Sequence, residues 1–399
     1  VPDEQPTIKD GFQDPQKILG FLHSCYFDLN NLNPMSYIRE DVSSTDEYVM
    51  PYQWNHRAQQ IAWDAINSGA IGDWTWAYGG YNGIRQCYLF LDGVQTAPRV
   101  TDAQKTQWSA EAKFLIAYYH FSILRKYGPC PIVDEAYNPN IALPEMPGRS
   151  HYDYVTDYIV NILDEIMPDL PADRSGSEWG RASQVVAKAV KARVLLYAAS
   201  PLWNGNTDYA DFKNTNFETP GYGLELVSQT FDANKWERAR RACQEALDFA
   251  QQLGYELYKP TTFAELNSMP AGPEKDFKVH VLRMRYLVTT RPNETDNNRE
   301  IIFGLPSQGS IIASWPHRVL QKSNGDWVSG YSGIAPTLNA IEQFYTENGY
   351  LPAEDPAFYP QDEWFQRAEA GAEIIKFHKN REPRFYAWIG FDGGEYGVK

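Results

Sequence analysis

The sequence lacks the short motifs that carry common enzyme chemistry. It contains no His-Glu-x-x-His zinc motif, no glycine-rich phosphate loop, no Gly-x-Ser-x-Gly elbow and no Gly-x-Gly-x-x-Gly fingerprint. The seven histidines are dispersed. Neighbouring carboxylates such as Asp134-Glu135 and Asp164-Glu165 are not, from sequence alone, a pair facing across a cleft, as a glycosidase needs. We therefore predict a chain that is not an enzyme and has no catalytic residues.

Cysteine is scarce as well. The four cysteines, Cys25, Cys87, Cys130 and Cys243, are scattered and form no Cys-x-x-Cys pair. This spacing suits neither a zinc site nor a dense disulfide framework. We expect buried free thiols, which leave the redox compartment open, and no cofactor or metal ligands; whether a structural calcium ion is bound stays an open question.

Long apolar runs and positive charge are also missing. No run of eighteen apolar residues exists, so no segment is expected to span a membrane. The 36 basic residues are outnumbered by 51 acidic ones, and the net charge of −15 disfavours nucleic acid and anionic lipid as partners. The hydrophobic content of 43% in 399 residues is enough for a full core.

Aromatic side chains, in contrast, are abundant. They make up 14% of the chain, with 12 Trp and 26 Tyr. Flat rings fill cores, but they also offer the apolar faces of a sugar a surface to stack on. Residues 48–91 hold ten aromatics, and residues 315–331 hold three among Pro, Gly, Ser and Asn. Aromatics on polar loops are better evidence of binding than aromatics on a helix stripe.

The stretch 183–200 predicts a helix that is buried on two sides. Ser183 is a good N-cap, apolar residues fall on two neighbouring faces, and Pro201 ends the pattern. Its many alanines let neighbouring helices approach closely. Arg193 lies apart from the lysines of this helix and is expected to need a buried acidic or carbonyl partner.

Further helical periods predict a repeat. Residues 112–121 overlay residues 187–196 at an offset of 75, and the helices that follow each share an aromatic–small–apolar spacing typical of a tetratricopeptide repeat. The alternative is that any two buried helices look alike. The predicted helices cover about 74–91, 101–127, 150–168, 183–200 and 233–253.

After Pro260 the pattern changes. Alternation predicts strands at 279–286, 299–305 and 384–389, and Thr337 predicts the start of a short helix. The fold class expected is mainly α: one domain over 1–399, with a tetratricopeptide-like helical scaffold at about 55–255. A loop-rich subdomain with a few short strands follows at about 256–399.

Six stretches, in order, resemble the SusD-like (SusD/RagB) family of outer-membrane nutrient-binding lipoproteins. The resemblance spans residue 12 to the end, and no single piece decides it. In chain order they are the stretch from Glu111-Ala112-Lys113 to Tyr127-Gly128-Pro129; the stretch from Gly180-Arg181-Ala182 to Pro201-Leu202-Trp203-Asn204-Gly205; Trp236-Glu237-Arg238-Ala239; Glu300-Ile301-Ile302-Phe303; Ala335-Pro336-Thr337; and Pro383-Arg384-Phe385.

The resemblance implies a cell-surface glycan-binding protein. Such a protein is lipid-anchored in the outer membrane and passes oligosaccharides to a SusC-like TonB-dependent transporter. The family's lipobox cysteine does not occur near Val1, so the anchor is only inferred. Two alternatives remain at this stage: an all-α glycoside hydrolase, and a helical-repeat scaffold for protein interaction.

We predict a glycan platform where the loop of Trp74 and Trp76 meets the loop of Trp315, Trp327 and Tyr331. Relatives likewise take their glycan-binding aromatics from an early helix–loop region and from the part after the repeats. Arg85 or Asn55 would supply hydrogen bonds to sugar hydroxyls. Three other tryptophans are assigned to the core. The predicted ligand-binding residues are Asn55, Trp74, Trp76, Tyr81, Arg85, Trp315, Trp327 and Tyr331, and the core tryptophans are Trp63, Trp108 and Trp236.

Overall fold

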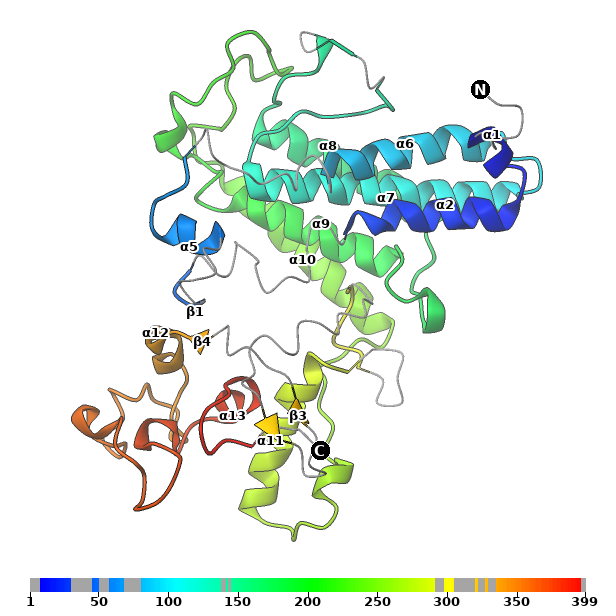
Figure 1. Cartoon of the computed structure of the whole chain (residues 1–399). Coiled ribbons are helices and arrows are strands. Elements are labelled where there is room, and N and C mark those ends of the chain that lie inside the picture. The colour runs from blue at the N-terminus through cyan, green and yellow to red at the C-terminus, as the bar shows by residue number, and fades with distance from the viewer. Residues whose placement is uncertain are drawn as a thin grey trace. The chain divides into compact units, whose positions relative to one another are not determined.

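The computed structural model is mainly helical, with a few two-residue strands, which confirms the predicted fold class (Figure 1). It describes residues 8–29, 45–49, 57–67, 80–137, 141–142, 145–290, 298–304, 320–321, 327–328 and 335–395. The chain divides into two compact units. Unit 1 comprises Val1–Asn33, Gly72–Glu256 and Ile301–Pro306, and unit 2 comprises Pro34–Ile71, Leu257–Glu300 and Ser307–Lys399.

Unit 1 is a stack of helices in which chain neighbours pack on one another. The helix α2 lies against α6 and α7, and α7, α8, α9 and α10 then follow in series (Figure 1). The predicted 75-residue repeat falls on the pairs α7–α8 and α9–α10, and the two helices of each pair pack on one another. The helices are α1 (Ile8–Gly11), α2 (Pro15–Phe27), α6 (Asn82–Gln95), α7 (Asp102–Tyr127), α8 (Tyr152–Ile166), α9 (Gln184–Ala199) and α10 (Ala233–Gln252), with 3-10 turns at Met167–Asp169, Gly176–Glu178 and Thr207–Tyr209.

Capping residues fix where these helices begin. Asp14 and Asp232 accept hydrogen bonds from the backbone N–H groups of Gln16 and Asn234. At α7 the side chain of Thr101 and that of Gln104 form a capping box. Before α8, Ser150 is the residue that the sequence pattern favours as the cap, but the cap is His151, whose side chain accepts from the backbone N–H of Asp153. Satisfied first-turn donors make these starts readable from sequence.

The helix α9 is buried on two sides, as predicted. Its buried residues include Val186, Val190 and Ala192, which belong to the core of unit 1. Two details were wrong. Ser183 is the N-cap but makes no capping hydrogen bond through its side chain. Arg193 is exposed, with its guanidinium 6.0 Å from the ring centre of Tyr197, so it needs no buried acidic partner.

Enlarging Ala192 is expected to destabilise unit 1. Ala192 is 7% exposed, and Ala192→Leu adds methylenes to a packed helix contact, which costs about 1–3 kcal/mol. Thermal unfolding measures this. Arg193→Leu, at the exposed neighbour on the same helix, is the control and should leave the melting temperature nearly unchanged. Equal melting temperatures for Ala192→Leu and the parent would contradict the packing.

Of the three tryptophans assigned to the core, only Trp108 is buried. Trp63, just after α5 (Arg57–Ala62), is 49% exposed, and Trp236 is 42% exposed. On α10 the small residues Ala239, Ala242, Ala246 and Ala250 face inward, and Trp236 lies on the outer face. Cys243, seven residues on, is exposed too, whereas the other three cysteines are buried free thiols as expected.

Unit 2 holds short elements. Its strands pair antiparallel in two ribbons, with Tyr48 opposite Pro336 in one and Leu320 opposite Val328 in the other. The side chain of Thr337 caps α12, as predicted. The elements are β1 (Tyr48–Val49), α5, α11 (Pro273–Leu287), β2 (Leu320–Gln321), β3 (Trp327–Val328), β4 (Ala335–Pro336), α12 (Leu338–Glu342) and α13 (Pro383–Trp388), with 3-10 turns at Ala264–Leu266, Gln361–Glu363 and Lys376–His378.

The three strands predicted after Pro260 were wrong. Residues 279–286 lie in α11 and residues 384–388 in α13, and residues 301–304 form no strand. Pro273 and Pro383 occupy the first turns of α11 and α13, where a missing N–H costs nothing. Acidic residues in the first turn of α11 and Arg285 in the last also favour a helix there.

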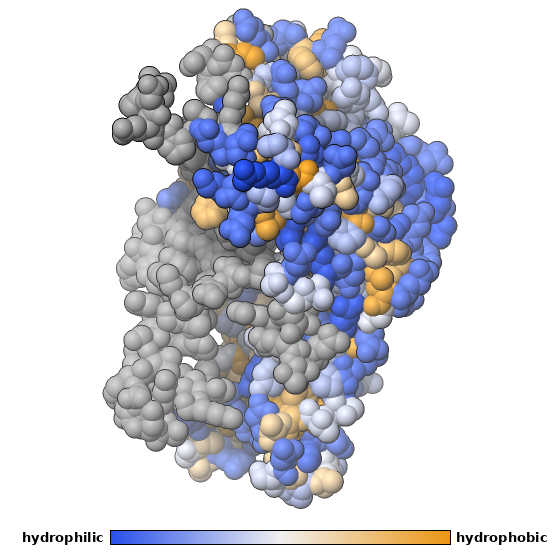
Figure 2. All heavy atoms as spheres, turned by 90° about the vertical axis from the view of Figure 1, so that its right-hand side faces the viewer, coloured by the Kyte–Doolittle hydropathy of each residue, from blue (hydrophilic) through white to orange (hydrophobic). Residues whose placement is uncertain are grey.

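The described surface is largely hydrophilic. Among the residues that carry colour in Figure 2, most are hydrophilic and the hydrophobic ones form separate patches. Within the described ranges, no helix combines the length and the hydropathy needed to cross a bilayer.

Candidate functional site

One face of α6 carries polar aromatic residues and a cation. Tyr81, Arg85 and Tyr88 are spaced four and three residues apart, so they lie on the same side of the helix. All three are half-buried. The opposite side of α6, with Ile84 and Cys87, is buried in the core. The half-buried face therefore brings together Tyr81 and Arg85, two of the predicted ligand-binding residues.

Tyr81 begins α6 and ties it to the segment after α7. Its hydroxyl donates to the carbonyl oxygen of Pro131 at 2.9 Å, and its ring meets the edge of His120 at 6.5 Å. Burial, together with the nearby thiol of Cys130, raises the pKa of Tyr81 well above its usual range. The hydroxyl therefore stays protonated and remains a hydrogen-bond donor to Pro131, which fixes the start of α6.

His120 is a buried, neutral side chain that lies between Tyr81 and Tyr158. It is fully buried on α7, and its Nδ1 lies 2.8 Å from the carbonyl oxygen of Ile116. Its Nε2 accepts from the backbone N–H of Val133 at 3.2 Å, so the proton is on Nδ1. Burial lowers the pKa of His120 to about 4. Its ring also meets the edge of Tyr158 at 5.2 Å, so it holds Tyr81 and Tyr158 apart.

Beyond His120, three phenols gather around one carboxylate. We call Tyr88, Tyr137, Tyr158 and Asp134 the phenol cluster. The hydroxyls of Tyr88 and Tyr158 are 3.2 Å apart, and the hydroxyl of Tyr137 reaches Asp134 at 3.5 Å. Burial raises the pKa of Tyr88, and the charge of Asp134 adds to this effect. The three rings are half-buried and Asp134 is exposed.

Arg85 differs from the other cations because its Nε is unsatisfied. This atom is buried and has no hydrogen-bond partner in the described part of the chain. A buried donor without an acceptor costs about 1–3 kcal/mol. An acceptor atom on a ligand would remove that cost. With the phenol cluster, the face offers apolar ring surfaces, hydroxyls, an acceptor and a free donor, which suits a polyhydroxylated ligand.

The other predicted site residues lie outside the described residues. Of Trp327 only the backbone is described, in β3. The platform of two loops therefore stays a prediction. No group of three or more His, Cys, Asp or Glu gathers for a metal ion among the described residues. The predicted site residues whose side chains lie outside the described part of the chain are Asn55, Trp74, Trp76, Trp315, Trp327 and Tyr331.

Sequence reasoning missed the phenol cluster. Tyr158 fits the apolar stripe of α8, so its position next to Tyr88 gives no separate signal. Asp134 was considered only with Glu135, as a carboxylate pair. The spacing of Tyr81, Arg85 and Tyr88 on one helix face was the available signal, and it would have added Tyr88 to the site.

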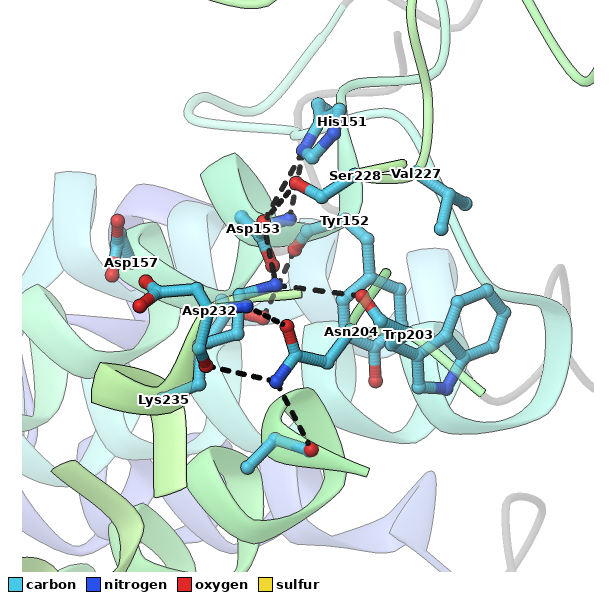
Figure 3. A network of polar contacts seen from close by, with 12 residues as sticks. His151, Tyr152, Asp153, Asp157, Trp203, Asn204, Val227, Ser228, Asp232 and Lys235 are labelled. Carbon is cyan, nitrogen blue, oxygen red and sulfur yellow. Dashed lines mark hydrogen bonds and ion pairs between the residues drawn. The ribbon is translucent and has the colours of Figure 1, made fainter. Parts of the chain in front are cut away.

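A second polar network, at the starts of α8 and α10, is internally paired (Figure 3). Lys235 donates to both carboxylate oxygens of Asp153, at 2.6 and 2.8 Å, and Ser228 donates to Asp153 at 2.8 Å. The amide of Asn204 exchanges hydrogen bonds with the backbone of Asp232. His151 Nε2 has no hydrogen-bond partner among the residues that the structure describes. The charged groups of the network neutralise one another, so it holds the 200–232 loop rather than offering a site.

Family profiles match both ends of the chain. Residues 3–196 match a family described as "Starch-binding associating with outer membrane", and residues 282–399 match the "SusD family". The chain belongs to the SusD-like family. The description of this family names binding and no reaction, in agreement with the prediction that the chain is not an enzyme, and it associates the family with the outer membrane.

Individual relatives support the same assignment. The chain is 30% identical over 236 residues to "Starch-binding protein SusD" of Bacteroides thetaiotaomicron, covering 57% of this chain and 40% of that protein. A solved structure named BT4246 is 47% identical with a TM-score of 0.86, over 97% of this chain and 66% of that one. A SusD-like protein from Bacteroides fragilis shares the fold at 21% identity and a TM-score of 0.64, over 94% and 60%. The chain thus spans less than two thirds of these relatives.

Proposed function

We propose that this SusD-like protein binds a glycan, without catalysis, on the face of α6 that carries Arg85 and Tyr88, beside the other members of the phenol cluster. The observation that carries the proposal is the buried Nε of Arg85, which has no partner in the described residues. A sugar hydroxyl is a suitable acceptor, and the neighbouring phenol rings can stack on the C–H faces of a sugar. The relative named as a starch-binding protein makes α-glucans the first ligands to test.

The remaining predicted aromatics belong to the same proposal. Trp74 and Trp76 stand a few residues before Tyr81 in the sequence, so they are candidates to extend the α6 face. Asn55, Trp315, Trp327 and Tyr331 are proposed as further glycan contacts.

Delivery of the glycan to a SusC-like TonB-dependent transporter, and a lipid anchor at the cell surface, complete the proposed role. Support for both comes from the family, since its description places the family at the outer membrane.

Removing the donor of Arg85 should weaken glycan binding. A hydrogen bond from a charged group contributes about 1.5–3 kcal/mol, and each ~1.4 kcal/mol is tenfold in affinity. Arg85→Gln is therefore expected to raise the dissociation constant at least about tenfold, measured by calorimetry with malto-oligosaccharides or with the best ligand from a glycan array.

Two measurements make the test decisive. Arg99→Gln, at an exposed position soon after α6, is the matched control and should bind like the parent. The melting temperature of Arg85→Gln should be equal to or above that of the parent, because the substitution removes a buried donor that has no partner. Full affinity in Arg85→Gln would contradict the site, and release of reducing ends from any bound glycan would contradict the non-catalytic role.

A further inference from the structure

Two buried cysteines face one another between α2 and α6. Cys25 on α2 and Cys87 on α6 are both fully buried in the core of unit 1. The two helices pack against one another. Free thiols in a core usually act as small apolar groups. Here their relative placement allows a different chemistry.

Contacts at both ends show that the two helices run antiparallel. Near the start of α2, the ring of Phe12 lies so close to Gly93, at the end of α6, that a Cβ there would be 2.0 Å from it. At the other end, Asn82 at the start of α6 donates to the carboxylate of Asp28 at 3.0 Å. The register along the interface follows from these two contacts.

The cysteines fall into register between two observed contacts. The rings of Phe21 and Phe90 meet at 5.8 Å between their centres. One turn further along α2 is Cys25, and one turn back along α6 is Cys87. The next contact in the same direction is the hydrogen bond of Asp28 with Asn82. Cys25 is four and three residues from these contacts and Cys87 is three and five, so the two cysteines fall at about the same level of the interface.

The electrostatics of the thiols agree with this placement. Burial raises the pKa of Cys87 well above its usual range, and the thiol of Cys25, which is within hydrogen-bonding reach, adds to this effect. The backbone of α2 is held at this level by Tyr119 of α7, whose hydroxyl donates to the carbonyl oxygen of Cys25 at 2.5 Å. A protonated, fully buried thiol is inert toward an external oxidant.

We propose that Cys25 and Cys87 form a disulfide bond that joins α2 to α6 when the chain folds in the presence of a disulfide oxidant. One cysteine, as thiolate, attacks the oxidant disulfide and displaces one thiol. The second cysteine then attacks the mixed disulfide and displaces the other thiol. The two cysteines lose two protons and two electrons, and the oxidant disulfide leaves as two thiols. The reaction takes place before the core closes, because the folded thiols are inaccessible.

The test compares the full chain exported to an oxidising bacterial periplasm with the same chain made in a reducing cytoplasm. Both samples are denatured with an alkylating agent present, and intact masses and non-reduced digests are measured. In the periplasmic protein we expect a peptide pair linking Cys25 to Cys87, with Cys130 alkylated. The cytoplasmic protein should show four alkylated cysteines.

Internal controls keep the proposal falsifiable. Cys130→Ser should retain the link, and Cys25→Ser should abolish it. Glutathione disulfide added to the folded cytoplasmic protein should modify the exposed Cys243 and leave Cys25 and Cys87 unmodified, which checks that the folded thiols are inaccessible. Folded periplasmic protein in which Cys25 and Cys87 are both alkylated, or in which either is linked to a different cysteine, would overturn the proposal.

Discussion

Replacing Glu111 by alanine is expected to destabilise unit 1 by about 3–5 kcal/mol. Glu111 lies on α7 with its side chain fully buried. It accepts from Arg174 at 2.7 Å, from Arg181 at 2.7 and 3.0 Å, and from the hydroxyl of Tyr26 at 2.9 Å. One carboxylate thus joins α2, α7 and the segment that leads into α9.

The size of this effect follows from what the substitution leaves behind. The side chain of Arg174 is 5% exposed and that of Arg181 is 12% exposed, so both cations would lose a buried counter-charge. Glu178 also pairs with both, but it is 51% exposed and is screened by water. An uncompensated buried charge is the costly outcome, whatever the net contribution of the intact network.

Chemical denaturation followed by circular dichroism measures the free energy of unfolding. The matched control is Glu165→Ala, which removes a carboxylate that is 63% exposed and pairs with Lys113 on α7; it should cost less than about 1 kcal/mol. Glu111→Gln should fall between the two, because the amide keeps one acceptor. A cost for Glu111→Ala as small as for Glu165→Ala would contradict the buried network.

The same network explains why part of the sequence resemblance is so specific. Arg181 belongs to the Gly180-Arg181-Ala182 string, and Glu111 opens the stretch that resembles the family's first long helix. The two strings are 70 residues apart in sequence and meet in a charge pair. Both stretches can be recognised in the sequence, but their contact cannot be predicted from it, because no local sequence pattern relates a helix residue to a loop 70 residues away.

The positions of α7 to α10 in unit 1 could be predicted because caps and apolar periods agree there, whereas no helix was predicted over α2. Thr101 and Asp232 mark true starts, and Gly128 marks the end of α7. In unit 2 the short elements lack such agreement. Residues 279–286 alternate like a strand, yet Pro273 starts a helix whose only buried residues are Val279 and Val281. An alternating pattern over a short segment predicts a strand only weakly, and helix start and stop signals on either side of the segment can outweigh it.

The candidate site was predictable only in part, for a related reason. The aromatic content indicates that rings serve binding, but it does not tell which rings are buried. Trp236 fits a helix stripe and is exposed, whereas Tyr158 fits a stripe and borders the site. The side of α10 that packs against α9 is the one with its buried alanines and not the one with Trp236. The sequence alone does not show this, because small residues mark a helix contact only once the partner helix is known.

In unit 2 the residue with the largest expected effect is Arg381. It is fully buried, and its guanidinium donates to four backbone carbonyl groups rather than to carboxylates. Three of these, from Ile341, Phe344 and Tyr345, lie at or just after the end of α12. The rings of Phe377 and Phe385 cover its two sides, 5.0 and 4.7 Å away.

This arrangement keeps a cation stable inside an aromatic core. Burial lowers the pKa of Arg381 to about 10, which still leaves it charged at neutral pH. The carbonyl dipoles at a helix end and the ring faces supply the negative potential. Lysine at this position would keep the charge, but its point-like ammonium lacks the planar fork that reaches all four carbonyls.

Arg381→Lys is therefore expected to destabilise unit 2 by about 3 kcal/mol or more, since at least two buried carbonyls would lose their donor. Hydrogen exchange, read by mass spectrometry on peptides from 341–391, measures the local free energy of opening. Arg384→Lys is the matched control, because Arg384 is 42% exposed and pairs with Glu382 at the surface; it should change exchange little. If both variants exchange alike, the core of unit 2 (Ile341, Trp364, Phe377, Phe385 and Phe391) is held by its aromatic packing alone and not by Arg381.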